Sequence, residues 1–162
     1  MKQSSSEQEM KELEQLENFN ELESLEETRL ASREIFDGKI LHVFEDTVRL
    51  PDGGEASREY LRHVGAVCVL PMLDDGCVLM ERQYRYPVGE VVTEIPAGKL
   101  NSADEDHLEA AKRELHEETG AIAEKWTSLG AFYPACDYSD EAIEMYLAEN
   151  IRFTERQLDA DE

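Results

Sequence analysis

The segment from Asn101 to Gly120 constrains the fold of this chain more than any other stretch of the sequence. Ser102 and Glu105 form a capping box at its start, and Gly120 suits the left-handed backbone position that commonly ends a helix. Apolar residues recur within it at helical spacing, and these are Leu108, Ala111 and Leu115. The segment is therefore predicted to form one amphipathic helix that packs its apolar face on a core.

Three carboxylates share another face of this predicted helix. Glu117 and Glu118 follow Glu114 by three and four residues in the stretch RELHEETG, and a helix turns by about 100° per residue, so the three side chains project together. Like charges at this spacing repel and weaken a helix unless a positive charge is bound. Clustered carboxylate oxygens without His or Cys suit Mg²⁺ or Mn²⁺. The alternative interpretation is an ordinary solvated helix face.

Strand patterns lie on both sides of the helix. In chain order these segments are 40–50, 58–63, 66–72, 77–85, 90–96, 126–134 and 141–150. The turn sequence PDGG predicts a hairpin between the first two, and LDDG predicts a second hairpin between 66–72 and 77–85. The continuous apolar run of 66–72 indicates a strand buried on both faces. Strands that bracket one helix predict an α/β or α+β sandwich.

The composition limits the partners that the chain can bind. The sequence carries 16 Lys and Arg against 38 Asp and Glu, a formal net charge of -22, which disfavours binding to nucleic acid or to an anionic membrane surface. No stretch approaches the roughly 18 apolar residues of a membrane span, and the N-terminus lacks the apolar segment of a signal peptide, so we expect a cytoplasmic protein of one domain. The cysteines indicate neither disulfides nor a zinc site, and Cys68 and Cys77 are predicted to be small core residues.

These motifs resemble those of the Nudix hydrolases, whose signature is a Gly, a Glu and then R-E-L-x-E-E-x-G on a loop-helix-loop. The matching residues are Gly98, Glu105, Arg113, Glu114, Leu115, Glu117, Glu118 and Gly120, followed by the small apolar Ala121. One departure is that six residues, not five, separate Gly98 from Glu105, which a loop absorbs easily. The resemblance implies an α/β fold, a Nudix-like α/β/α sandwich of mixed sheet with one catalytic loop-helix-loop.

The extent of the resemblance sets the expected domain boundaries. It covers about residues 30–160, so we expect a Nudix hydrolase domain at 29–162 that lacks the family's final C-terminal elements. Residues 1–28 hold nine Glu and two Lys, and we expect them to form an acidic N-terminal appendage, either helical or disordered. The resemblance also implies a homodimer formed through exchanged N-terminal strands, at roughly 33–63 in this chain.

The resemblance is closest to the ADP-ribose pyrophosphatase branch of the family. The stretches GAVCVLP, RQYRYPV, EIPAGKL and YSDEAIEMYLAE carry it. It implies metal-dependent hydrolysis of the diphosphate bond of ADP-ribose or a related nucleoside diphosphate sugar, giving AMP and ribose 5-phosphate, with Mg²⁺ as the cofactor and Mn²⁺ as the alternative ion. Members of this branch commonly carry a Pro where this chain has Cys136, so the substrate assignment rests on overall similarity.

The resemblance also assigns the metal site. Its ligands would be the backbone carbonyl of Ala97 and the carboxylates of Glu114 and Glu118, while Glu117 would bind the metal or orient it through water. Arg113 would hold the glutamate side chains in place, a role that suits its planar fork of donors. Glu117, Glu118 and Arg113 are therefore expected to belong to the catalytic set.

The remaining assignments concern the base and the substrate. A general base is expected in the last acidic loop, where Glu162 is the first candidate and Asp161 the second. The residues expected to bind substrate are Arg58, Arg85, Glu94 and Glu141. Arg85 would contact the diphosphate and Arg58 the nucleotide side of the substrate.

Other classes of function stay open at this point. The chain would be a non-catalytic nucleotide-binding domain if it kept the fold without the reaction, or a pyrophosphatase for another dinucleotide if its loops select one. It would be an acidic interaction protein if residues 1–28 carried its function and the helix face were merely solvated. Hydrolysis of a nucleoside diphosphate compound is the observation that separates these classes.

Overall fold

The computed structural model describes residues 25–154 of the chain. The predicted general base, Glu162 or Asp161, lies outside these residues, and so does most of the predicted appendage at 1–28. Both stay predictions. Where the length led us to expect one domain, the chain divides into two compact units, the first ending at Tyr60 and the second beginning at Leu61. Each unit is described by itself below.

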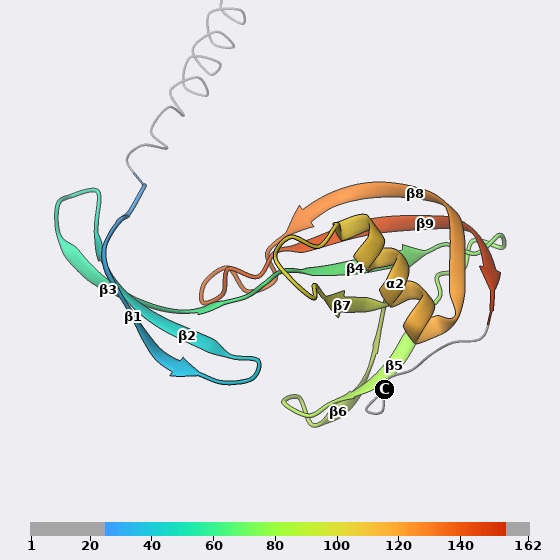
Figure 1. The fold of residues 1–162 in the computed structure, drawn as a ribbon, viewed down its shortest axis with the longest axis horizontal. Coiled ribbons are helices and arrows are strands. Elements are labelled where there is room, and N and C mark those ends of the chain that lie inside the picture. Colours follow the sequence, from blue (N-terminus) through green and yellow to red (C-terminus); the bar gives the residue numbers. More distant parts are fainter. Residues whose placement is uncertain (1–24, 155–162) are drawn as a thin grey trace, which may run out of the picture. The chain divides into compact units, whose positions relative to one another are not determined.

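The first unit is built around a three-stranded sheet in the order β1–β2–β3 (Figure 1). The strands are β1 (Thr28–Asp37), β2 (His42–Arg49) and β3 (Glu55–Arg62), and β1 pairs with β2 in antiparallel fashion. The predicted PDGG turn is confirmed, because the Gly53 amide donates to the Leu50 carbonyl at 2.9 Å. Strand β1 was not predicted, since all its residues are exposed and it lacks an apolar face that would reveal it.

The second unit holds a four-stranded mixed sheet in the order β7–β4–β9–β8. Its strands are β4 (Ala66–Pro71), β7 (Ala97–Lys99), β8 (Ala121–Phe132) and β9 (Ile143–Phe153). Strand β4 pairs antiparallel with β7 and parallel with β9. The helix α2 (His107–Thr119) contacts all four strands (Figure 1). The predicted mixed sheet with one helix is confirmed for residues 25–154.

The predicted second hairpin is confirmed only next to its turn. The segments that the sequence paired are joined by one antiparallel bridge, Met72 to Val78, and by the backbone hydrogen bonds that flank it. The rest of the second segment forms β5 (Glu81–Arg85), which pairs with β6 (Glu90–Glu94) in a separate two-stranded sheet. The physical reason is that β4 is buried along almost its whole length, as predicted, and both its edges are taken by β7 and β9. The turn sequence LDDG forms a turn but does not begin a long hairpin.

The two cysteines predicted to be core residues have different environments. Cys68 is buried in β4, and burial raises the pKa of its thiol to about 11, so it stays an uncharged apolar group. Cys77 is exposed, which corrects the prediction, because it ends the turn that begins at Leu73. The Asp75 carboxylate beside it raises the pKa of the Cys77 thiol.

Helix α2 is capped at both ends, and only the C-terminal cap is the one that the sequence predicted. Its N-cap is Asp106, whose side chain accepts from the Glu109 amide at 3.0 Å, so the predicted capping box at Ser102 is wrong. Glu105 is used differently: its carboxylate accepts from the Asn101 amide at 2.5 Å. The predicted end at Gly120 is confirmed, with φ of 71° and an amide that donates to the His116 carbonyl.

The core of the second unit lies between α2 and the sheet. The buried cluster consists of Val67, Val69, Leu100, Ala110, Ala111, Leu115, Ala121, Tyr146 and Ala148. Alanines at 110 and 111 let the helix approach the strands closely, and Leu115 fills the space between them. Among residues 25–154, no helix is long and apolar enough to cross a membrane.

Shortening Leu115 is expected to destabilise the second unit. The Leu115→Ala variant loses a side chain that is 0% exposed, so we expect the free energy of unfolding to fall by about 2–5 kcal/mol. Urea titration followed by circular dichroism measures this change. Leu129→Ala is the matched control, because Leu129 is 50% exposed in β8. Equal losses in the two variants would contradict the assigned core.

Candidate functional site

The predicted metal-binding carboxylates lie where α2 meets β7. The Glu114 side chain is buried over the backbone of Gly98, and a Cβ atom added at Gly98 would lie 2.0 Å from the Glu114 carboxyl carbon and 2.2 and 2.3 Å from its oxygens. Gly98 therefore leaves the space that the Glu114 carboxylate occupies. The sequence marked Gly98 as a signature position but did not reveal this steric reason.

Glu118 reaches the same strand from the next turn of the helix. Its Oε2 atom accepts a hydrogen bond from the Ala97 amide at 3.2 Å. Ala97 is itself held in the sheet by its pairing with Cys68 of β4. The structure thus brings the backbone around Ala97 and Gly98 together with the carboxylates of Glu118 and Glu114. The contact to Glu118 is made by the Ala97 amide, and the assignment of the Ala97 carbonyl and the two carboxylates to a metal stays a prediction.

Arg113 contacts three carboxylates at once. Its Nη1 atom donates to Glu114 Oε1 at 2.6 Å and to Glu117 Oε2 at 3.1 Å, while its Nε and Nη2 atoms both donate to Glu105 Oε1 at 3.3 Å. Burial alone would lower the pKa of the guanidinium, but the hydrogen bonds and charges of Glu114, Glu117 and Glu105 raise it above its ordinary value. Arg113 therefore fixes the directions of these side chains and stays charged.

The charge at this face of α2 is strongly negative. Four carboxylates gather here, those of Glu114, Glu117 and Glu118 on the helix and that of Glu105 just before it, and Arg113 supplies one positive charge among them. The Asn101 amide, followed by Arg113, lowers the pKa of Glu105, so this carboxylate stays ionised. Hard oxygen donors with excess negative charge are the ligands that Mg²⁺ and Mn²⁺ take. The residues present fit a divalent cation.

The residues predicted to bind substrate occupy several places. Arg85 of β5 donates from Nε to Glu94 Oε1 of β6 at 2.8 Å, so the structure brings these two residues together. Glu141 lies in the loop before β9, where its Oε1 atom is 3.6 Å from His63 Nδ1. Arg58 belongs to the first unit and donates from Nε to Glu27 at 2.9 Å. Their roles toward a substrate stay predictions.

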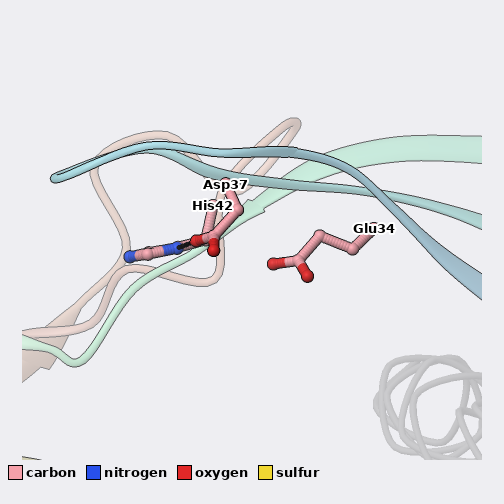
Figure 2. A group of neighbouring side chains, drawn as sticks. All are labelled: Glu34, Asp37 and His42. Atoms are coloured by element: carbon pink, nitrogen blue, oxygen red, sulfur yellow. Dashed lines mark hydrogen bonds and ion pairs between the residues drawn. The ribbon is translucent and has the colours of Figure 1, made fainter.

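A second group of side chains with metal-ligating atoms lies in the first unit (Figure 2). It consists of Glu34, Asp37 and His42, whose ligand atoms all lie within 4.8 Å of one another. The His42 Nδ1 and Asp37 Oδ1 atoms already lie 2.7 Å apart. Glu34 and Asp37 are both exposed. The sequence pattern missed this group, because an irregularity between Glu34 and Phe36 changes the alternation of side chains along β1.

Family models match both units of the chain. The NUDIX domain matches residues 61–162, and the nucleoside diphosphate sugar hydrolase N-terminal domain matches residues 27–61. The two matches meet where the first unit gives way to the second. The helix and strand that carry the acidic face lie within the NUDIX match.

Individual proteins are similar over most of the chain. The ADP-ribose pyrophosphatase of Bacillus subtilis strain 168 is 42% identical over 143 residues, which cover 87% of this chain and 77% of that protein. The methanol dehydrogenase activator of Bacillus methanolicus is 37% identical over 137 residues, with coverage of 85% and 74%. The crystal structure of an ADP compounds hydrolase superposes with a TM-score of 0.73 at 25% identity, covering 86% of this chain and 75% of that one. The chain belongs to the Nudix family of hydrolases.

Proposed function

We propose that this enzyme hydrolyses the diphosphate bond of ADP-ribose or of a related nucleoside diphosphate sugar, giving AMP and ribose 5-phosphate from ADP-ribose. The observation that carries the proposal is the acidic face of α2, where Glu114 fills the space over Gly98 and Glu118 binds the Ala97 amide. The similarity to a protein named ADP-ribose pyrophosphatase supports the choice of substrate.

Magnesium is the cofactor that we propose, with manganese as the alternative ion. The Ala97 carbonyl, Glu114 and Glu118 would hold it, and Glu117 would hold it directly or through water. A bound divalent ion neutralises diphosphate charge and lowers the pKa of the attacking water. Because the chain has a formal net charge of -22, an anionic substrate needs such local compensation.

The side chains around the metal site would divide the remaining work. Arg113 keeps Glu114 and Glu117 in fixed directions, so the ligands are preorganised before the substrate arrives. The oxygen of a water molecule forms a bond to one phosphorus, the bond from that phosphorus to the bridging oxygen breaks, and the proton of the water passes to a general base. Glu162, or Asp161 in its place, remains the proposed base.

The substrate would contact residues outside the metal site. Arg85 would bind the diphosphate, and its hydrogen bond to Glu94 supports this role by fixing the guanidinium. Glu94 and Glu141 would accept hydrogen bonds from the sugar or the base, since ionised carboxylates only accept. Arg58 would contact the nucleotide side.

We also propose a homodimer in the cytoplasm. Large apolar side chains of the first unit are exposed, namely Leu30, Ile35, Phe36, Ile40 and Leu41. A second copy that covered them would remove this apolar surface from water, which supports an assembly through the N-terminal strands. Sedimentation equilibrium measures the mass directly.

A panel of nucleoside diphosphate compounds tests the proposed function. With magnesium present we expect AMP from ADP-ribose, and the highest kcat/KM in the panel for ADP-ribose or another nucleoside diphosphate sugar. Chelation of divalent ions by EDTA should reduce AMP release to the background rate, and added magnesium should restore it. Chromatographic detection of AMP measures both. The absence of hydrolysis for every member of the panel would reject the proposal in favour of a nucleotide-binding role.

A further inference from the structure

One ring nitrogen of His63 faces both a hydrogen-bond donor and a carboxylate. The Nδ1 atom accepts a hydrogen bond from the Gly65 amide at 3.1 Å, and the same atom lies 3.6 Å from Glu141 Oε1. Both side chains are partly buried, with 21% of His63 and 28% of Glu141 exposed. The two contacts require different protonation states of the same atom.

The chemistry of the partners makes these two contacts mutually exclusive. A backbone amide only donates, so its bond to Nδ1 needs the lone pair of a neutral imidazole that carries its proton on Nε2. An ionised carboxylate only accepts, so Glu141 can bond to Nδ1 only when that atom carries a proton. Protonation of His63 therefore exchanges the Gly65 amide for the Glu141 carboxylate.

The backbone on both sides of His63 and Glu141 is fixed by hydrogen bonds, so the exchange of partners involves only the two side chains. Backbone hydrogen bonds join the loop before β9 to residues 61–66: Leu61 N–H to Tyr138 O at 2.8 Å, Asp140 N–H to Leu61 O at 3.1 Å and Ala66 N–H to Ala142 O at 3.0 Å. Asp140 also accepts from the His63 amide at 2.7 Å, a bond that does not involve the ring. Because the loop is tied on both sides of Glu141, a proton on His63 changes the direction of the Glu141 carboxylate rather than the path of the loop.

We propose that His63 is a positioning residue that sets the direction of the Glu141 carboxylate. The inference rests on the proposed function, in which Glu141 binds the substrate. Neutral His63 leaves the carboxylate free to meet the substrate, and His63 protonated on Nδ1 draws it into an ion pair. The carboxylates that contact His63 within the described part of the chain are those of Asp140 and Glu141, and Asp140 accepts from the backbone amide rather than from the ring.

The expected signature is a pH-dependent component of KM that requires His63, whereas the pH profile of kcat, which the metal and the general base set, should be the same in the wild type and in the His63 variant. Histidine changes charge between about pH 8 and about pH 5.5, so the KM for ADP-ribose should rise by about threefold across this interval, as a partly exposed ion pair of modest strength competes with the substrate. His63→Asn is the decisive variant. The side-chain oxygen of Asn can accept from the Gly65 amide but does not take up a proton in this pH range. The threefold rise in KM between high and low pH should therefore disappear, and the KM at high pH should equal that of the wild type.

Two further variants complete the kinetic test. Glu141→Gln should raise KM at both ends of the pH range and also lose the His63-dependent component. His42→Asn is the matched control, because His42 makes a similar ring contact with Asp37 at 2.7 Å in the first unit (Figure 2), and its KM profile should equal that of the wild type. A His63→Asn profile that keeps the wild-type rise in KM, or a loss of that rise in His42→Asn, would overturn the proposal.

A spectroscopic readout separates this inference from the proposed function. In carbon-detected NMR spectra the side-chain carboxyl resonance of Glu141 should move with pH together with the His63 ring in the wild type and should lose this component in His63→Asn. An intact coupling without hydrolysis of any substrate would overturn the proposed function. Hydrolysis of ADP-ribose without this coupling would overturn the role of His63 alone.

Discussion

The Glu118→Gln variant is expected to hydrolyse ADP-ribose with a kcat/KM about a thousandfold below that of the wild type, because Glu118 is a proposed metal ligand and the loss of its charge would remove several kcal/mol of stabilisation from the transition state. Glutamine has the size of glutamate, and its side-chain oxygen can still accept from the Ala97 amide, a bond of 3.2 Å in the wild type. The helix should therefore keep its place. Steady-state kinetics measure the loss, and calorimetry should show weaker magnesium binding.

The control for this substitution lies on the same helix. Glu109→Gln also removes one carboxylate from α2, but Glu109 is 67% exposed and pairs with Lys112. We expect its kcat/KM to stay within about twofold of the wild type, since an exposed ion pair contributes little. Equal activity in Glu118→Gln and the wild type would show that the acidic face is an ordinary solvated surface.

The Gly98→Ala variant is expected to lose at least about a hundredfold in kcat/KM, because groups that orient metal ligands affect activity on this scale. The added Cβ would lie 2.0 to 2.3 Å from the atoms of the Glu114 carboxyl group, so this group must move. The Gly98 backbone is not in the left-handed region, and Ala can adopt its conformation. The melting temperature should therefore fall only slightly while activity collapses.

A second glycine serves as the control for Gly98→Ala. Gly54 also has a backbone that Ala can adopt, and an added Cβ would lie 3.0 Å from the Asp52 side chain in the first unit. Gly54→Ala should keep wild-type kcat/KM. If Gly98→Ala were as active as Gly54→Ala, Glu114 would not be a metal ligand in the position that the structure gives it.

The helix and its acidic face could be predicted from the sequence because both depend on local spacing. Glu114, Glu117 and Glu118 lie within one turn, so any helix over these residues brings them together. Gly120 ends the helix through a local backbone requirement that the sequence also reveals. Local spacing is the information that a single sequence carries most directly.

The start of the helix was mispredicted because two cap patterns overlap. Ser102 with Glu105 and Asp106 with Glu109 both read as an N-cap followed three residues later by Glu. The structure uses the second, and Glu105 instead binds the Asn101 amide and Arg113. Tertiary contacts of Glu105 decided between patterns that the sequence could not rank.

The pairing of strands and of distant side chains could not be predicted from the sequence, because it depends on residues far apart in the chain. Ala66 of β4 pairs with Ile143 of β9 across more than seventy residues, and alternation along either strand carries no information about its partner. The contact of His63 with Glu141 depends on the same long-range pairing, because it forms only once the loop before β9 is seated beside β4. The steric role of Gly98 likewise follows only from the packing of α2 on β7.

The placement of Arg113 has a consequence for how the enzyme responds to scarcity of metal. A built-in positive charge among Glu105, Glu114 and Glu117 offsets part of their mutual repulsion before any cation arrives. The helix therefore relies less on an external ion to form than it would without Arg113. Changes in the cellular supply of divalent ions would then alter turnover more than the amount of folded enzyme.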